Sequence, residues 1–117
     1  MRILILDDEA YRHVVLNKKL AGNEIINTYT FDQAIAALSG FKFDVLFLDH
    51  DLEHVDSTHT GYDVCQFIKS KLPKDKHPNQ VVIHSMNPVG AHQMDQTLQG
   101  LGFAVEVHPF HMLVQKL

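Results

Sequence analysis

The feature that most constrains the fold of this chain is a series of short apolar runs, separated by segments with a helical pattern. Clear runs occupy residues 3–6, 45–48, 81–83 and 103–107, and a weaker one occupies 24–29. Continuous apolar runs of this length are typical of strands that are buried on both faces, as in a parallel sheet. The chain therefore predicts a sheet that is covered by helices on both sides.

The segments between these runs carry helix signals. Helices are expected over residues 10–20, 30–40, 60–72, 87–101 and 110–117. Thr30 and Thr60 are candidate N-caps, and Asn87 followed by Pro88 is a typical helix start. The expected core-facing side of the first helix consists of Tyr11, Val14, Val15 and Leu20. Strands and helices that alternate in this way predict one doubly wound α/β domain over residues 1–117, a three-layer sandwich with a five-stranded, mostly parallel sheet.

Composition limits the classes of protein to which this chain can belong. The chain has 117 residues, 45% of them hydrophobic, which is enough for one core. Its single cysteine cannot form an internal disulfide, and no apolar stretch is long enough to span a bilayer, so we expect a cytoplasmic protein without a membrane contact. A formal net charge of −4 argues against binding to duplex nucleic acid. It leaves open a small phosphorylated ligand or a terminal phosphate of RNA.

Polar residues follow each strand that is expected to border a binding crevice. In doubly wound sheets, ligands bind beyond the carboxyl ends of the strands. The residues that follow the successive runs there are Asp7, Asp8 and Glu9; Asp49, His50 and Asp51; His84, Ser85 and Asn87; and His108. This convergence is the strongest functional signal in the sequence.

The residue types at these strand ends predict a metal site beside a phosphate site. Carboxylates that lie close together repel one another unless a cation neutralises them. The expected metal ligands are Asp7, Asp8, Asp49 and Asp51. Carboxylates alone favour Mg²⁺, whereas added imidazoles shift the preference towards Mn²⁺, Zn²⁺, Fe²⁺ or Ni²⁺. The expected acid–base groups are His50, His84 and His108, and the expected phosphate-binding groups are Ser85, Asn87 and Gly90.

Each of these signals also has a structural explanation when taken alone. An acidic pair after a strand is often a helix N-terminal charge, and single histidines such as His84 and His108 are often structural. The convergence of all of them at one edge of the sheet favours function. We expect three other histidines, His13, His77 and His111, to be solvated. The loop over residues 53–60 is expected to be a functional lid.

The order of elements and the strand-end residues resemble those of response-regulator receiver domains across the whole chain. Asp7 and Asp8 match the acidic pair of that family, Asp49 matches its phospho-accepting aspartate, and Ser85 matches its hydroxyl position. This resemblance implies the receiver topology, with the strand order 2-1-3-4-5. The sequence His108-Pro109-Phe110 stands where the family has Lys-Pro-Phe, so the lysine that pairs with the phosphoryl group is missing.

A more specific resemblance is to the cyclic-phosphate-processing receiver domains. It is carried by LDHDL at residues 48–52, TGYDV at 60–64 and IHSMNPVGA at 83–91. That group is proposed to act enzymatically on cyclic phosphate ends of RNA or of nucleotide-like small molecules, in association with RNA repair. The resemblance therefore implies an enzyme that takes a small phosphorylated substrate, such as an ADP-ribose-type molecule, or an RNA end.

Three functions follow from this pattern. The first is a metal-dependent phosphoesterase, in which a metal-bound water or Asp49 attacks phosphorus and the histidines move protons. The second is an atypical receiver that a partner kinase phosphorylates on Asp49 and that turns nothing over. The third is a binding domain that has kept the pocket without metal affinity. We expect the phosphoesterase first, with the receiver as its alternative.

Overall fold

The computed structural model describes residues 1–117 as five strands and five α-helices that alternate along the chain. The strands are β1 (Arg2–Leu6), β2 (Glu24–Thr28), β3 (Val45–Leu48), β4 (Gln80–Ile83) and β5 (Ala104–Val107). The helices are α1 (Ala10–Lys19), α2 (Phe31–Gly40), α3 (Gly61–Ser70), α4 (Pro88–Leu98) and α5 (Phe110–Lys116), with a 3₁₀ turn at Lys74–Lys76. Every strand and helix that the sequence predicts is present. None of the helices is long and apolar enough to cross a bilayer.

The strands form one parallel sheet in the order β2-β1-β3-β4-β5. Ile3 of β1 pairs with Ile25 of β2 and with Val45 of β3, and Leu48 of β3 pairs with Ile83 of β4. This order and the parallel direction confirm the predicted receiver topology. A parallel sheet places the carboxyl ends of all its strands at one edge, so the polar residues that follow them become neighbours.

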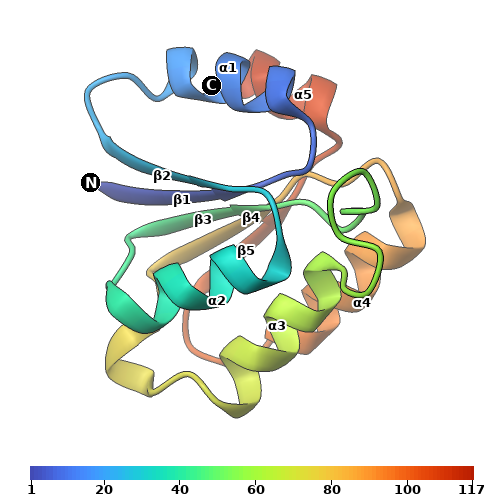
Figure 1. The fold of residues 1–117 in the computed structure, drawn as a ribbon. Helices are drawn as coiled ribbons and strands as arrows, with labels where there is room; N and C mark the ends of the chain where they lie inside the picture. Colours follow the sequence, from blue (N-terminus) through green and yellow to red (C-terminus); the bar gives the residue numbers. More distant parts are fainter.

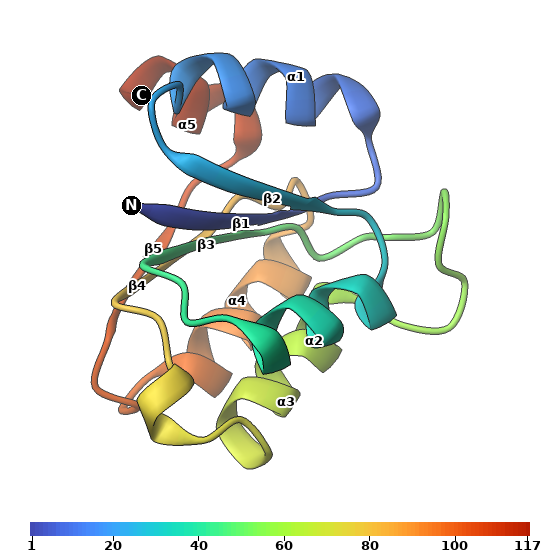
Figure 2. The same ribbon diagram turned by 60° about the vertical axis from the view of Figure 1, so that its left-hand side comes forward.

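Helices cover both faces of the sheet. Figures 1 and 2 show α1 and α5 on one face and α2, α3 and α4 on the other. The side with α2, α3 and α4 holds a cluster of 17 buried residues, and the side with α1 and α5 holds a smaller cluster of eight. Leu4, Leu46 and Val81 point into the larger cluster, whereas Ile3, Phe47 and Val82 point into the smaller one. Both faces are apolar because the central strands β1, β3 and β4 are buried on both sides, whereas the edge strands β2 and β5 are partly exposed.

Side-chain caps fix the starts of α3 and α4, the helices that follow β3 and β4. The Thr60 hydroxyl accepts a hydrogen bond from the Tyr62 amide, and the Asp63 carboxylate accepts one from the Thr60 amide, which together make a capping box. Asn87 accepts from the Gly90 amide at 3.0 Å, and Pro88 occupies the first turn of α4. Thr30 accepts from the Gln33 amide at 3.2 Å, so all three predicted caps are confirmed.

The predicted core-facing side of α1 is wrong in two of its four members. Tyr11 and Val14 are exposed, and the buried residues of the helix are His13 and Leu16. The predicted solvation of His13 is wrong for the same reason. Its Nε2 donates to the carbonyl oxygen of Asp7 at 2.8 Å. This hydrogen bond, with a second one between His13 and Asn27, sets the rotation of the helix. His13 therefore faces the sheet, and Val14 faces the solvent.

Candidate functional site

The carboxyl ends of β1, β3 and β4 are held in step by backbone hydrogen bonds that continue the ladder past the last strand residues. The Asp49 amide donates to the Leu6 carbonyl, and the His84 amide donates to the Leu48 carbonyl, both at 3.0 Å. Asp7, Asp49 and His84 therefore leave the sheet side by side. This arrangement follows directly from parallel pairing and needs no contribution from the loops.

Three carboxylates gather at this edge. Asp7, Asp8 and Asp49 each offer one oxygen, and these three atoms lie within 4.8 Å of one another. Asp7 and Asp49 are buried, while Asp8 is partly exposed. Asp51, the fourth predicted metal ligand, lies outside this group, because its Oδ1 pairs with His50 Nδ1 at 2.8 Å. The set of three carboxylate oxygens fits a divalent cation.

Arg12 supplies the positive charge that the acidic cluster contains in this structure. Its Nη1 lies 3.4 Å from Asp7 Oδ2 and 3.4 Å from Asp49 Oδ2, and its side chain is only 17% exposed. The sequence analysis did not identify this residue. Its signal was faint, since one arginine in the first turn of a helix is ordinarily a surface charge.

The two buried aspartates titrate in opposite directions. Burial and the neighbouring charge of Asp7 raise the pKa of Asp49 to about 8, although Arg12 opposes the shift. Burial would also raise the pKa of Asp7, but hydrogen bonds from His84 and from the Glu9 amide, helped by the charge of Arg12, lower it overall. Without a bound cation, Asp49 is therefore the carboxyl that holds a proton at neutral pH. A cation near the cluster favours its ionised, nucleophilic form.

His84 is a buried partner of Asp7. The side chain is fully buried, and its Nε2 lies 2.9 Å from Asp7 Oδ2. Burial lowers the pKa of His84, which favours the neutral ring with its proton on Nε2. Its Nδ1 has no hydrogen-bond partner, and the ring packs edge-on against Phe110 at 5.9 Å. The ring supports the acidic cluster from below and has no exposed surface for a ligand.

His50 lies between the end of β3 and the start of α4. Its ring covers Gly90, where an added Cβ would lie 2.5 Å from the imidazole. The Gly90 amide, which was expected to bind phosphate, donates to Asn87 Oδ1. The Asn87 side chain lies 3.4 Å from Asp51 Oδ1. These four residues form a hydrogen-bonded and packed unit beside the acidic cluster.

Ser85 follows His84 at the end of β4 and is 5% exposed. Its Oγ accepts a hydrogen bond from the Asn87 amide at 3.0 Å. An oxygen that accepts in this way still carries its own proton. The hydroxyl is thus free to donate to a second group.

His108 lies away from the acidic cluster. Its Nε2 is 3.3 Å from Glu106 Oε1 and 3.5 Å from Lys116 Nζ. The hydrogen bond from His108, together with Lys116, lowers the pKa of Glu106. His108 lines a separate, mostly apolar hollow with Leu113. The structure therefore does not bring the fourth predicted catalytic residue to the other three.

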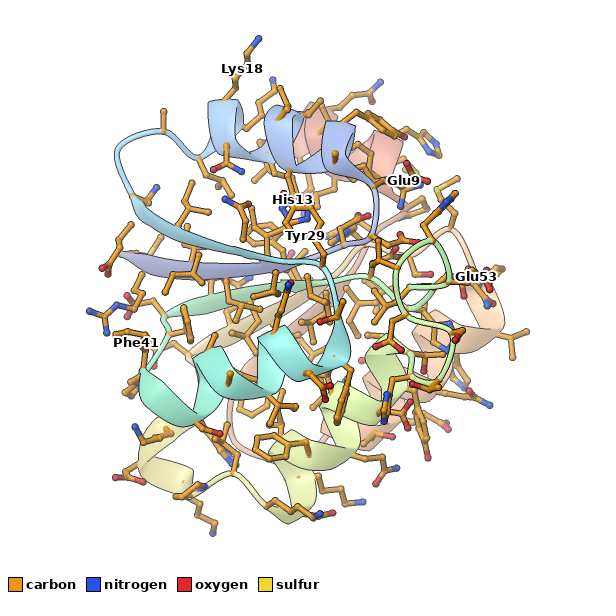
Figure 3. The ribbon with its side chains drawn as sticks, in the orientation of Figure 1. Glu9, His13, Lys18, Tyr29, Phe41 and Glu53 are labelled. Atoms are coloured by element: carbon orange, nitrogen blue, oxygen red, sulfur yellow. The ribbon has the colours of Figure 1, made fainter.

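The loop between β3 and α3 forms one wall of a hollow over the acidic cluster. This hollow has a volume of about 190 Å³, and its lining consists of Asp8, Glu9, Arg12, Asp49, Asp51, Glu53, His54 and Met86. The His54 amide donates to Asp8 Oδ2 at 3.1 Å, and the His54 ring pairs with Glu9 at 2.7 Å. Figure 3 shows Glu9 and Glu53 on the side of the molecule where this loop lies. Glu53 and His54 thus line the hollow, and the role of residues 53–60 as a functional lid stays a prediction.

Gly61 is a second residue that the sequence analysis missed. A Cβ at this position would overlap the carbonyl oxygen of Asp49, and the Gly61 amide donates to the His50 carbonyl at 2.8 Å. The return of the loop to the end of β3 thus requires glycine. The signal was present in the string TGYDV, where a glycine follows the N-cap directly.

Several solved structures with the same fold are of response regulators. A Burkholderia pseudomallei response regulator with a phosphorylated aspartic acid, a calcium ion and citrate matches with a TM-score of 0.66 and 16% identity, over 97% of this chain and 64% of that one. This chain thus spans just under two thirds of that protein. TrrA of Thermotoga maritima in complex with Mg²⁺ and BeF matches with a TM-score of 0.68 and 21% identity, over 98% of this chain and 94% of TrrA.

A third match is TrrA bound to the histidine kinase ThkA, with a TM-score of 0.68 and 21% identity, over 98% of this chain and 93% of the matched one. No curated protein matches the sequence. At these identities the structural matches establish the fold.

These matches contradict the prediction that the chain is a metal-dependent phosphoesterase, that is, a hydrolase of a cyclic phosphodiester. The matched proteins are receivers, one with a phosphorylated aspartate, and they fit the alternative reading of Asp49 as a phospho-acceptor better. The geometry gives a physical reason. His84 is sealed beneath Asp7, and His108 lies at another hollow, so these rings do not converge on one reacting water.

Membership of a family is shown by the sequence itself. The model of the cyclic-phosphate processing receiver domain matches residues 2–100, a range that contains the whole acidic cluster, Arg12, His84 and Ser85. This chain belongs to the cyclic-phosphate processing receiver domain family.

Proposed function

We propose that this domain is a signalling receiver that accepts a phosphoryl group on Asp49. The observation that carries the proposal is the position of Asp49, buried at the end of the central strand β3 with Asp7 and Asp8 within 4.8 Å. Ser85 leaves the adjacent strand β4. The fold and these four positions are those of a phospho-accepting receiver.

The chemistry is a transfer of one phosphoryl group. A carboxylate oxygen of Asp49 attacks phosphorus, the bond between phosphorus and the donor's leaving atom breaks, and an acyl phosphate forms on Asp49. The leaving group takes the electron pair of the broken bond. The Ser85 hydroxyl donates a hydrogen bond to a phosphoryl oxygen, which holds the group against the end of β4.

The acidic cluster is suited to a resident divalent cation held by Asp8 and Asp49, with Asp7 beside them. When bound, such an ion neutralises the carboxylates and offsets the charge of the incoming phosphoryl group. The structure places no imidazole in this group of three ligands, since His84 and His50 pair with aspartates. A set of carboxylates favours Mg²⁺ over Zn²⁺ or Ni²⁺.

The partner in this proposal is a phosphodonor, either a histidine kinase or a small acyl phosphate. TrrA, which shares this fold, forms a complex with the kinase ThkA. The hollow of about 190 Å³ above Asp49 admits one phosphoryl group and its donor atom. A cytoplasmic location is part of the proposal, because phosphohistidine donors are made from ATP.

The test is phosphorylation of the purified domain with acetyl phosphate and Mg²⁺, followed by intact-mass spectrometry. We expect one phosphoryl group on the wild type and none on Asp49→Asn, which removes the nucleophile and keeps the shape. Asp51→Asn, two residues away and outside the cluster, is the matched control and is expected to be phosphorylated. Processing of a nucleoside 2′,3′-cyclic phosphate that is lost in Asp49→Asn would contradict the proposal.

A further inference from the structure

The β5 end of this domain carries no cation that can reach a phosphoryl group on Asp49. His108 stands where receivers have the lysine that pairs with that group, and it pairs instead with Glu106. Lys116, the neighbouring cation, also pairs with Glu106, with its Nζ 3.4 Å from Oε1. A phosphoryl group brings close to two negative charges into a buried acidic site. The site therefore needs a positive charge from another element.

Arg12 is placed to provide that charge from α1. Its Nη1 lies 3.4 Å from Oδ2 of Asp49, the carboxylate that would carry the phosphoryl group. Arg12 also lines the hollow above this carboxylate. A distance of 3.4 Å to each of two acceptors is longer than the 2.7–2.9 Å of a tight charge-assisted bond. The guanidinium is thus shared between two carboxylates and tightly bound to neither.

Two aromatic rings lie against the Arg12 guanidinium. The guanidinium carbon lies 5.2 Å from the ring centre of Phe110 and 5.8 Å from that of Tyr11, whose hydroxyl accepts from Nε at 3.3 Å. Contacts of this kind favour the cation and fix its orientation. Phe110 is the first residue of α5, so the cation rests on the element that follows the missing lysine.

We propose that Arg12 replaces the receiver lysine by pairing with the phosphoryl group on Asp49. The proposal rests on the proposed function. In the unphosphorylated domain Arg12 bridges Asp7 and Asp49. In the phosphorylated domain its positive charge pairs with the phosphoryl oxygens.

This role predicts effects of opposite sign on two ligands. Arg12 competes with a divalent cation for the carboxylates, because both are positive and both need Asp49. It cooperates with a phosphoryl group, because the two have opposite charges. If Arg12 only stabilised the fold, its substitution would weaken the binding of both ligands or of neither.

The experiment measures two dissociation constants for the full chain: that of Mg²⁺ alone by calorimetry, and that of beryllofluoride at saturating Mg²⁺ by ¹⁹F NMR. The variants are Arg12→Met, which keeps an unbranched stem against Phe110, and Arg12→Lys, which keeps the charge. Arg2→Gln is the charge-matched control, because Arg2 pairs with Glu24 on an exposed surface. Thermal unfolding reports on the fold of each variant.

We expect Arg12→Met to bind beryllofluoride about tenfold more weakly or worse, and to bind Mg²⁺ more tightly than the wild type. Arg12→Lys should recover most of the beryllofluoride affinity, and Arg2→Gln should match the wild type. If Arg12→Met does not fold, a loss in Arg12→Lys larger than about tenfold overturns the proposal.

Two negative results have different meanings. If the wild type binds no beryllofluoride, the proposed function fails and this inference fails with it. If the wild type binds the analogue and Arg12→Met binds it equally well, Asp49 remains the acceptor and only the role of Arg12 is overturned. Weaker binding of both ligands by Arg12→Met would also overturn it, since that result marks a structural role.

Discussion

The ends of β3 and β5 lie at the same edge of the sheet, yet they are built in different ways. At the end of β3, Asp49 is 2% exposed and is surrounded by Asp7, Asp8 and Arg12. At the end of β5, the His108 side chain is 23% exposed and forms a surface hydrogen bond with Glu106. The first end is a buried electrostatic site, and the second is a solvated pair.

This difference shows which part of a receiver the chain has retained. Paired charges in a buried site interact strongly and are screened little by salt, whereas exposed pairs contribute little. The β3 end has the carboxylate cluster to which the proposed function assigns a cation and a phosphoryl group. The β5 end has lost its lysine, and the nearest cation to Asp49 now comes from α1.

The largest expected effect tests how rigidly the β3 end is built. Gly61→Ala places a methyl group on the backbone carbonyl of Asp49, which cannot move without breaking the strand end. We expect a loss of more than about 3 kcal/mol in the free energy of unfolding, measured by urea denaturation. Gly40→Ala, at a position with open space around it, is the control and should be nearly neutral. Equal stability of the two variants would show that the loop can adjust.

A second comparison truncates a histidine at each strand end. His84→Ala leaves a cavity and deprives the buried Asp7 carboxylate of its donor, so we expect a loss of about 3 kcal/mol. His108→Ala removes one exposed pair, and we expect a loss below about 1 kcal/mol. Chemical denaturation of both variants at neutral pH without metal measures the difference. Similar losses would mean that the two ends are not built differently.

Much of the fold and half of the site could be predicted from the sequence. Buried strands leave a continuous apolar signal, and caps such as Thr60 and Asn87 mark helix starts within a few residues. Once the sheet is parallel, Asp7 and Asp49 must lie together, because the strand ends share one edge. These conclusions depend only on local patterns and one topological rule.

The other half depends on tertiary contacts that leave weak local signals. Arg12 reaches Asp49 because α1 turns His13 towards the sheet, and this rotation is fixed by hydrogen bonds that join His13 to Asp7 and to Asn27. Apolar periodicity predicted a different rotation. The position of His108 was partly predictable, because Glu106 is two residues earlier in a strand and shares its face.

The loop after β3 gives a smaller, pH-dependent effect. Burial would raise the pKa of Asp56, but hydrogen bonds from the Phe31, Thr58 and His59 amides and from the Thr58 hydroxyl lower it to about 2. Because folding lowers this pKa from its ordinary value of 3.8, the stabilisation is complete above that value and is lost as the pH falls through about 2.

Asp56→Asn should therefore lower the free energy of unfolding by about 1 kcal/mol at neutral pH. The difference from the wild type should disappear as the pH falls to about 2. Thermal unfolding of both proteins across the acidic range measures this convergence. Asp75→Asn, on the exposed 3₁₀ turn, is the control and should follow the wild type throughout. A constant difference at all pH values would mean that the Asp56 charge is not the cause.

The smallest expected effect comes from restoring the missing lysine. A lysine at position 108 would start beside Glu106, and Lys116 would repel it from the side that faces α5. The new ammonium group would pair with Glu106 in a partly exposed position, where such pairs are weak and local. We therefore expect His108→Lys to change the affinity for beryllofluoride by less than about threefold, measured by ¹⁹F NMR with Mg²⁺ present. A gain of about tenfold would show that the β5 end is still oriented towards Asp49 and lacks only its charge, and the contrast between the two strand ends would then be one of residue identity alone.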